Sequence, residues 1–214
     1  MGDPKKDYKA SIIIGIAAAA LSTIMVNNFG ITNPAVYVAV ALMLLFMPPI
    51  GIFVARFIGK RSQGIYQFIK FGETGGLNTF VDLGVLNLLI LITGLSAGIY
   101  YSIFKGISFV SAIINSYFWN KHWVFESKAK GQSQEKEFAK FAIVSVGGFV
   151  VNVAAATLIV TLAKNSTASP KIVANVAAAI AFILTMAWNF LGYKLVVFVK
   201  PKSQSKKLNE KSAT

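Results

Sequence analysis

The sequence predicts an all-α fold: an integral membrane helical bundle of six transmembrane helices. Of its 214 residues 55% are hydrophobic, and the mean hydropathy of +0.63 is above that of an ordinary soluble domain. A helix needs about 20 apolar residues to cross a hydrocarbon core about 30 Å thick. Runs of that order recur at roughly 10–29, 35–58, 71–93, 99–120, 141–163 and 171–193.

Local signals mark the ends of several of these helices. Asn33 and Ser169 each place a capping side chain directly before a proline, which favours the first helical position. Residues 94–98 begin and end with glycine and carry no charge, so they predict a short turn between two spans. The pair Pro48 and Pro49 lies inside the second run, where it removes two backbone donors and predicts a bend.

An internal repeat links the last four runs. FIKF at 68–71 matches FAKF at 138–141, and NKHWVF at 120–125 aligns with YKLVVF at 193–198. Each repeat contains two spans, and an even number preserves orientation, so we expect two parallel two-helix repeats. The predicted organisation is a cytoplasmic N-terminus with an extra transmembrane hairpin (1–63), a four-helix domain (64–200) and a disordered basic cytoplasmic tail (201–214).

The distribution of charge predicts the orientation. With the N-terminus inside, 18 of the 21 Lys and Arg residues lie on the cytoplasmic side, and only Lys105, Lys164 and Lys171 lie outside. The positive-inside rule therefore places both termini in the cytoplasm, with the chain in the cytoplasmic membrane. Attraction of the basic segments to anionic lipids then explains the formal charge of +13 without a nucleic-acid partner.

Residues suited to catalysis or metal binding are scarce. There is no cysteine and a single histidine, His122, and no set of His, Asp and Glu has metal-ligand spacing. A nucleotide-binding motif is also missing from the sequence, which argues against ATP-driven pumping by this chain. We therefore expect no catalytic residues, no metal and no cofactor, and a protein that is not an enzyme.

Each of the four repeat helices carries one strip of polar side chains. Polar groups inside a membrane normally face the interior of a bundle or a cavity, so the four strips are predicted to converge. Neutral members of such strips also serve as hydrogen bonds between helices. The residues singled out on these strips are Asn78, Asp82, Lys105, Ser108, Asn115, Asn152 and Asn189.

Three charged residues of these spans call for an explanation. Asp82 and Lys105 lie within about one and a half turns of each other in depth, so they could form an ion pair. Alternatively, Lys105 could extend outward to the membrane surface. Glu73 is about 180° from Asp82 on its helix and close to the cytoplasmic interface, where we expect a solvated acid near a helix start.

Three segments together resemble the GtrA-like family of membrane proteins. GGLNTFVDLG (75–84) is similar to the signature of the family's first helix, and NSYFWNKHWVF (115–125) to its cytoplasmic end motif. NFLGYKLVVF (189–198) matches the corresponding end of the second repeat. The resemblance covers about residues 66–199, so the first two helices depart from the family's four-span pattern and no role is transferred to them.

The resemblance implies translocation or carriage of a polyprenyl-phosphate-linked sugar for cell-surface polysaccharide synthesis, beside a membrane-associated glycosyltransferase that loads the lipid. On this interpretation the seven polar residues named above bind the substrate. Lys105 from outside, or Lys121 and Lys194 from inside, would then meet the lipid phosphate as charged donors. The positive-inside rule by itself also accounts for Lys121 and Lys194.

Two other functions remain open at this stage. The chain could be a small multidrug-type exporter in which Asp82 is a proton-coupled acid. It could instead be a non-transporting membrane anchor that recruits a glycosyltransferase. Four short helices enclose little space for a substrate. A homodimer is therefore considered as an alternative to a monomer.

Overall fold

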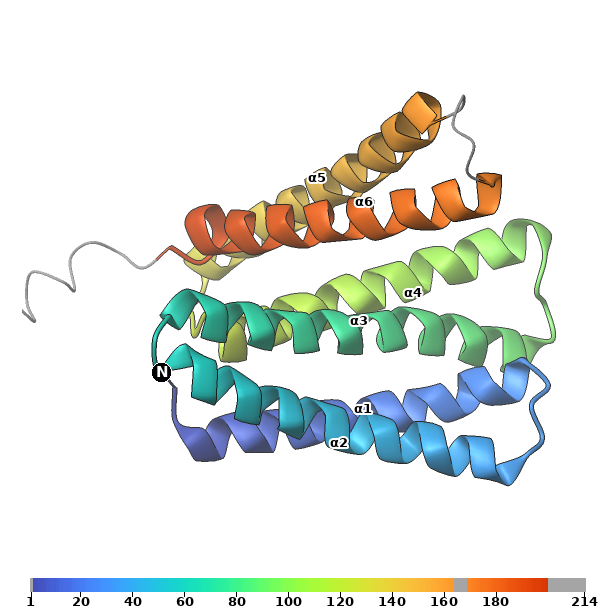
Figure 1. Ribbon diagram of the computed structural model, residues 1–214, viewed down its shortest axis with the longest axis horizontal. Helices are drawn as coiled ribbons and strands as arrows, with labels where there is room; N and C mark the ends of the chain where they lie inside the picture. The colour runs from blue at the N-terminus through green and yellow to red at the C-terminus, as the bar shows by residue number, and fades with distance from the viewer. Residues whose placement is uncertain (1, 164–168, 200–214) are drawn as a thin grey trace, which may run out of the picture. The chain divides into compact units, whose positions relative to one another are not determined.

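The computed structural model describes residues 2–163 and 169–199, and within those ranges the chain is helical without strands (Figure 1). This confirms the predicted all-α membrane bundle. The predicted tail, 201–214, lies outside the described residues. The helices are α1 (Pro4–Asn28), α2 (Pro34–Gly59), α3 (Gln63–Thr93), α4 (Gly98–Trp119), η1 (Asn120–Val124), α5 (Gln132–Leu162), α6 (Pro170–Gly192) and η3 (Tyr193–Val197).

The chain forms two compact units. The first, Met1–Glu126, holds α1 to α4 and η1. In it α1, α2 and α3 pack against one another, and α3 also packs along α4 (Figure 1). The second unit begins at Ser127 and holds α5, α6 and η3, with α5 and η3 both packed against α6.

The helix ends follow the local signals in the sequence. The Asn33 side chain accepts a hydrogen bond from the backbone N–H of Ala35 at 2.9 Å, and Ser169 accepts one from Ile172 at 3.4 Å. Gly94 ends α3 with a φ of 71°, a left-handed conformation that glycine adopts without steric cost.

Hydropathy alone underestimates the length of several helices, most of all α3 and α5. α3 and α5 have 31 residues each and begin at Gln63 and Gln132, ahead of the apolar runs expected from 71 and 141. The preceding segments are polar enough to fall outside an apolar run, yet they continue the helix. At α3 the start is marked by Ser62, whose hydroxyl accepts a hydrogen bond from the N–H of Ile65 at 3.4 Å.

Among the described residues, five of the six α-helices are long and apolar enough to cross a membrane. The exception is α4, which has 22 residues and so is long enough for the hydrocarbon core. Its deficit is therefore in hydropathy, because Lys105, Asn115 and several serines interrupt its apolar residues.

Both halves of the predicted repeat have the same order of elements. A 31-residue helix is followed by a shorter helix and then by a five-residue π-helix, η1 in one case and η3 in the other. Lys121 and Lys194 are each the second residue of their π-helix. π-Helical turns are rare and occur frequently at functional sites.

The proline pair has a specific partner on α1. α2 continues through Pro48 and Pro49, which cannot donate to the carbonyls of Leu44 and Leu45 four residues earlier. A Cβ atom built on Gly15 would lie 2.8 Å from the Leu44 oxygen and 3.1 Å from the Leu45 oxygen. Only a glycine lets α1 approach these carbonyls so closely.

Candidate functional site

An ion pair joins the polar strips of α3 and α4. The Lys105 ammonium donates to Oδ2 of Asp82 at 2.5 Å, and the Ser108 hydroxyl donates to Oδ1 at 2.7 Å. In the structure Lys105 therefore pairs with Asp82 and does not extend outward to the membrane surface. The side chains of Lys105 and Asp82 remain 41% and 25% exposed within the protein, so a ligand can reach them.

Two amides flank this ion pair on its η1 side. Asn78 lies one turn before Asp82 on α3, and Asn115 lies about two turns after Ser108 on the antiparallel α4. Oδ1 of Asn78 and Nδ2 of Asn115 are buried and have no hydrogen-bond partner among the residues that the structure describes. Because an unsatisfied buried polar atom costs about 1–3 kcal/mol, these amides are well suited to bind a polar ligand.

The second repeat also pairs its polar residues. Nδ2 of Asn152 on α5 donates to the Thr185 hydroxyl of α6 at 3.1 Å. Oδ1 of Asn189 packs against Gly148, where a Cβ would come within 2.3 Å of it. This oxygen has no hydrogen-bond partner in the ranges that the structure describes. The strips thus meet within each repeat, and convergence of all four remains a prediction.

The two π-helical lysines differ in exposure. The Lys121 ammonium lies 3.3 Å from the Tyr117 hydroxyl and 5.5 Å from the centre of its ring, and this lysine is only 2% exposed. Lys194 has the same relation to Phe190, 5.4 Å from the ring, and is partly exposed. Lys121 is therefore enclosed by the protein, although the family resemblance suggests it as a contact for the lipid phosphate. Lys194 is accessible for such a contact.

Sequence reasoning missed a buried ionic cluster around Asp7. Oδ2 of Asp7 accepts from the Arg56 guanidinium at 2.6 Å and from the Tyr66 hydroxyl. Oδ1 lies 3.1 Å from the Lys70 ammonium and accepts from the indole N–H of Trp123 at 3.1 Å. This carboxylate joins four elements of the first unit, namely α1, α2, α3 and η1.

The signal that could have revealed the cluster is the periodicity of α1. Asp7 shares one face with the residues of α1 that are buried, among them Ala10, Ser11, Ile14 and Ala18. The sequence places Arg56 and Lys70 among the cytoplasmic charges that set the orientation, but Lys70 is only 1% exposed. Trp123, which donates to Asp7, is likewise only 2% exposed.

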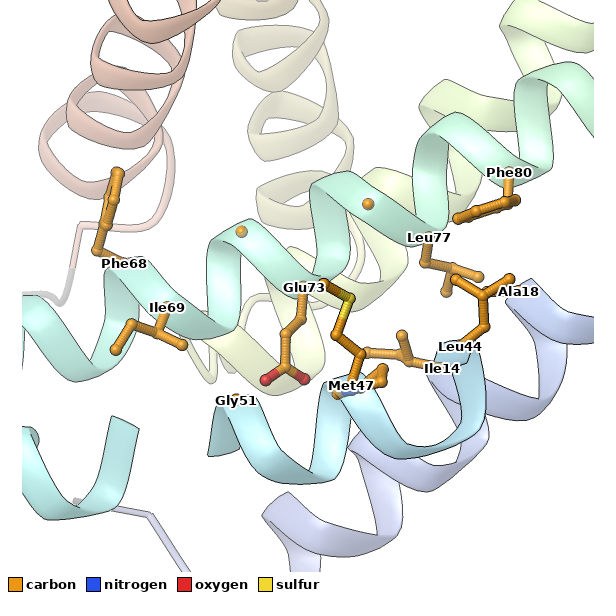
Figure 2. A pocket seen from close by; sticks show the side chains of 13 residues that line it. Ile14, Ala18, Leu44, Met47, Gly51, Phe68, Ile69, Glu73, Leu77 and Phe80 are labelled. Carbon is orange, nitrogen blue, oxygen red and sulfur yellow. The ribbon is translucent and has the colours of Figure 1, made fainter. Parts of the chain in front are cut away.

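The expectation for Glu73 is wrong. α3 begins ten residues earlier, at Gln63, so Glu73 is not near the helix start. Both carboxylate oxygens are buried and lack a hydrogen-bond partner within the described part of the chain. Figure 2 shows the side chain directed at α2, where Gly51 leaves room for it; a Cβ on Gly51 would lie 2.7 Å from Oε1.

Glu73 lines a pocket of about 400 Å³ between α1, α2 and α3 (Figure 2). The other lining residues are apolar or glycine: Ile14, Ala18, Leu44, Met47, Pro48, Gly51, Phe68, Ile69, Gly72, Gly76, Leu77 and Phe80. No group of three His, Cys, Asp or Glu residues able to hold a metal occurs in the ranges 2–163 and 169–199.

These features define a helical protein of several membrane spans, built on a repeated two-helix unit with polar strips inside each repeat. The family described as the GtrA/DPMS transmembrane domain matches residues 70–198. The chain therefore belongs to this family, and with it to membrane proteins of processes that involve lipid-linked sugars.

A relative in Bacillus subtilis (strain 168) supports the assignment. The chain is similar to the uncharacterized membrane protein YngA, with 30% identity over 143 residues. The match covers 67% of this chain and 86% of the relative. The family match begins at Lys70, so α1 and α2 lie outside it.

Proposed function

We propose that the chain moves a polyprenyl-phosphate-linked sugar across the cytoplasmic membrane, as a translocase or carrier in cell-surface polysaccharide synthesis. The observation that carries this proposal is the Asp82–Lys105–Ser108 cluster, with the buried, unsatisfied amide atoms of Asn78 and Asn115 beside it. Membership of a family concerned with lipid-linked sugars supports it.

The chemistry of the strip suits the head of such a lipid. A sugar presents hydroxyls that both donate and accept, and the strip offers a carboxylate, a hydroxyl and two amides. The phosphate needs a cation at membrane depth, and the partly exposed Lys105 ammonium can supply it as a charged donor. The polyprenyl tail requires no site of its own because it can stay in the lipid.

The second repeat carries a polar strip of the same kind. Asn152, Asn189 and the accessible Lys194 supply the same kinds of groups on α5, α6 and η3. In this proposal Lys194 is a further cation that meets the lipid phosphate, at the cytoplasmic end of the second repeat. A membrane-associated glycosyltransferase would load the lipid on this side of the membrane.

The arrangement of Asp82 favours this role over proton-coupled export. A carboxylate that carries protons must be released from its partners in each cycle, and Asp82 is held by both Lys105 and Ser108. Phosphate binding needs no such release, because the partly exposed Lys105 ammonium has three N–H donors and can contact a phosphate oxygen while it stays paired with Asp82.

The test is transport in vesicles that contain the purified chain and no glycosyltransferase. Polyprenyl-phosphate hexoses, radiolabelled in the sugar, are placed in the outer leaflet, and their loss of access to an impermeant oxidant is followed in time. We expect the sugar-lipid to become protected from the oxidant faster than in protein-free vesicles. With Lys105→Gln, protection should be little faster than in protein-free vesicles. Glu135→Gln, an exposed carboxylate on α5, is the matched control.

Two results would overturn the proposal. Protection no faster than in protein-free vesicles excludes an autonomous translocase. If the chain instead only brings a glycosyltransferase to vesicles in a flotation assay, it is a membrane anchor.

A further inference from the structure

The pocket that holds Glu73 lies on the opposite side of α3 from the polar strip that contains Asn78 and Asp82. Glu73 and Asp82 are nine residues apart, which at about 100° per residue places them about 180° apart. The pocket is built by α1, α2 and α3, whereas the strip runs between α3 and α4. It is therefore a second site, which the proposed function does not use.

The carboxylate of Glu73 has no hydrogen-bond partner among the described residues. Arg56 and Lys70, the basic members of the Asp7 cluster, are both bound to Asp7. A carboxylate among apolar groups is strongly destabilised in its ionised form, and either a proton or a paired cation removes this penalty. The geometry thus leaves a position for a positive charge from outside the chain.

The walls of the pocket restrict which cation can fit. No other lining side chain carries a charge or a hydroxyl, so a divalent metal would lack most of the six to eight oxygen ligands it requires. A sugar would lose its hydration without gaining hydrogen bonds. The phosphate of an anionic lipid would be repelled by Glu73.

We propose that this pocket binds a lipophilic monovalent cation, whose charged group pairs with the Glu73 carboxylate and whose apolar body lies between α1, α2 and α3. The volume of about 400 Å³ is within the usual range for small-molecule sites. Phe68 and Phe80 line the same space and offer aromatic faces, which attract cations.

The test is direct binding to the full chain in nanodiscs of uncharged lipid. Labelled tetraphenylphosphonium and the slimmer benzyltrimethylammonium serve as probes, and tetraphenylborate serves as an anion of matched shape. The formal charge of +13 favours the anion in any non-specific association. Saturable binding of at least one cation, which tetraphenylborate does not displace, is therefore the expected result.

Two variants test the two halves of the pocket. Glu73→Gln removes the charge and should weaken cation binding by about tenfold or more. Gly76→Leu should weaken it to a similar degree by filling the space, because Gly76 lines the pocket and a Cβ there meets no atom within 4 Å.

Gly75→Leu is the matched control, since its Cβ also meets nothing within 4 Å but it is not part of the lining. It should bind the cation as the unmodified chain does. Equal binding by Glu73→Gln, equal binding of tetraphenylborate, or no binding of either cation would each overturn the proposal. Because Glu73→Gln and Gly76→Leu act independently, failure of one to fold leaves the other as the test.

Discussion

Asp7 and Lys70, 63 residues apart in the sequence, form an ion pair with 3.1 Å between the Lys70 ammonium and Oδ1 of Asp7. Neither side chain is more than 2% exposed. Lys70 is the first residue of the family match, whereas Asp7 and Arg56 belong to the preceding hairpin. The hairpin is thus attached to the family domain through a buried charge rather than only through apolar packing.

We expect Asp7→Asn to destabilise the first unit strongly. It leaves the Lys70 ammonium buried without its counter-charge, and breaking a buried pair in this way typically costs about 3–5 kcal/mol. Adding Lys70→Met should restore part of the loss, because the uncompensated charge is then removed. The measurement is the free energy of unfolding in detergent, with Glu135→Gln as control. An unchanged free energy for Asp7→Asn would show that the pair contributes nothing.

Asp82 and Lys105 can be tested by a double-mutant cycle. Asp82→Asn and Lys105→Gln combined should be milder than the worse single change, since each single variant leaves one charge unpaired. We expect a coupling free energy of about 0.5–3 kcal/mol, as for residues in direct contact. Stability in detergent is measured beside sugar-lipid protection in vesicles. Strict additivity in both assays would mean that the two residues do not interact.

The close approach of α1 to α2 depends on Gly15. Gly15→Ala places a Cβ 2.8 Å from the Leu44 carbonyl oxygen, which belongs to the backbone and cannot turn away. The two helices must separate, so the thermal midpoint should fall. Gly106→Ala is the control, because its Cβ meets no atom within 4 Å and alanine favours a helix by about 0.5–1 kcal/mol. A midpoint for Gly15→Ala at or above that of Gly106→Ala would contradict this packing.

The two π-helical lysines should respond differently to loss of charge. Lys121→Gln removes a buried ammonium and its aromatic contact, so it should lower stability. Lys194→Gln should leave stability nearly unchanged and slow the movement of sugar-lipid, whereas Lys194→Arg should retain most of it. If Lys194→Gln transports as well as the unmodified chain, Lys194 does not meet the phosphate.

The orientation in the membrane is accessible to single-cysteine labelling, because the chain has no cysteine of its own. Cysteine in place of Ser96, in the exposed turn between α3 and α4, should react with an impermeant thiol reagent added outside cells. Cysteine in place of Ser133, in the first turn of α5, should react only after permeabilisation. The reverse pattern would place both termini outside.

The sequence by itself determined the features that depend on neighbouring residues. Helix ends at Asn33, Ser169 and Gly94 follow from capping and from glycine's freedom at positive φ, which act within a few residues. The apolar runs indicated the spans, and the matching segments around Lys70 and Lys140 indicated the repeat. The sequence also indicated the polar strip of α4, and it placed Lys105 at nearly the same depth as Asp82 of α3.

Only the tertiary structure decided which charges have partners. Asp7 looks like a surface acid because its partners Arg56, Lys70 and Trp123 are 49 to 116 residues away. Glu73 looks like a solvated acid until α2 lies against α3 and encloses it. The physical reason is that the environment of a charge is set by packing between helices. Periodicity shows which face of a helix is buried, but not which other helix covers it.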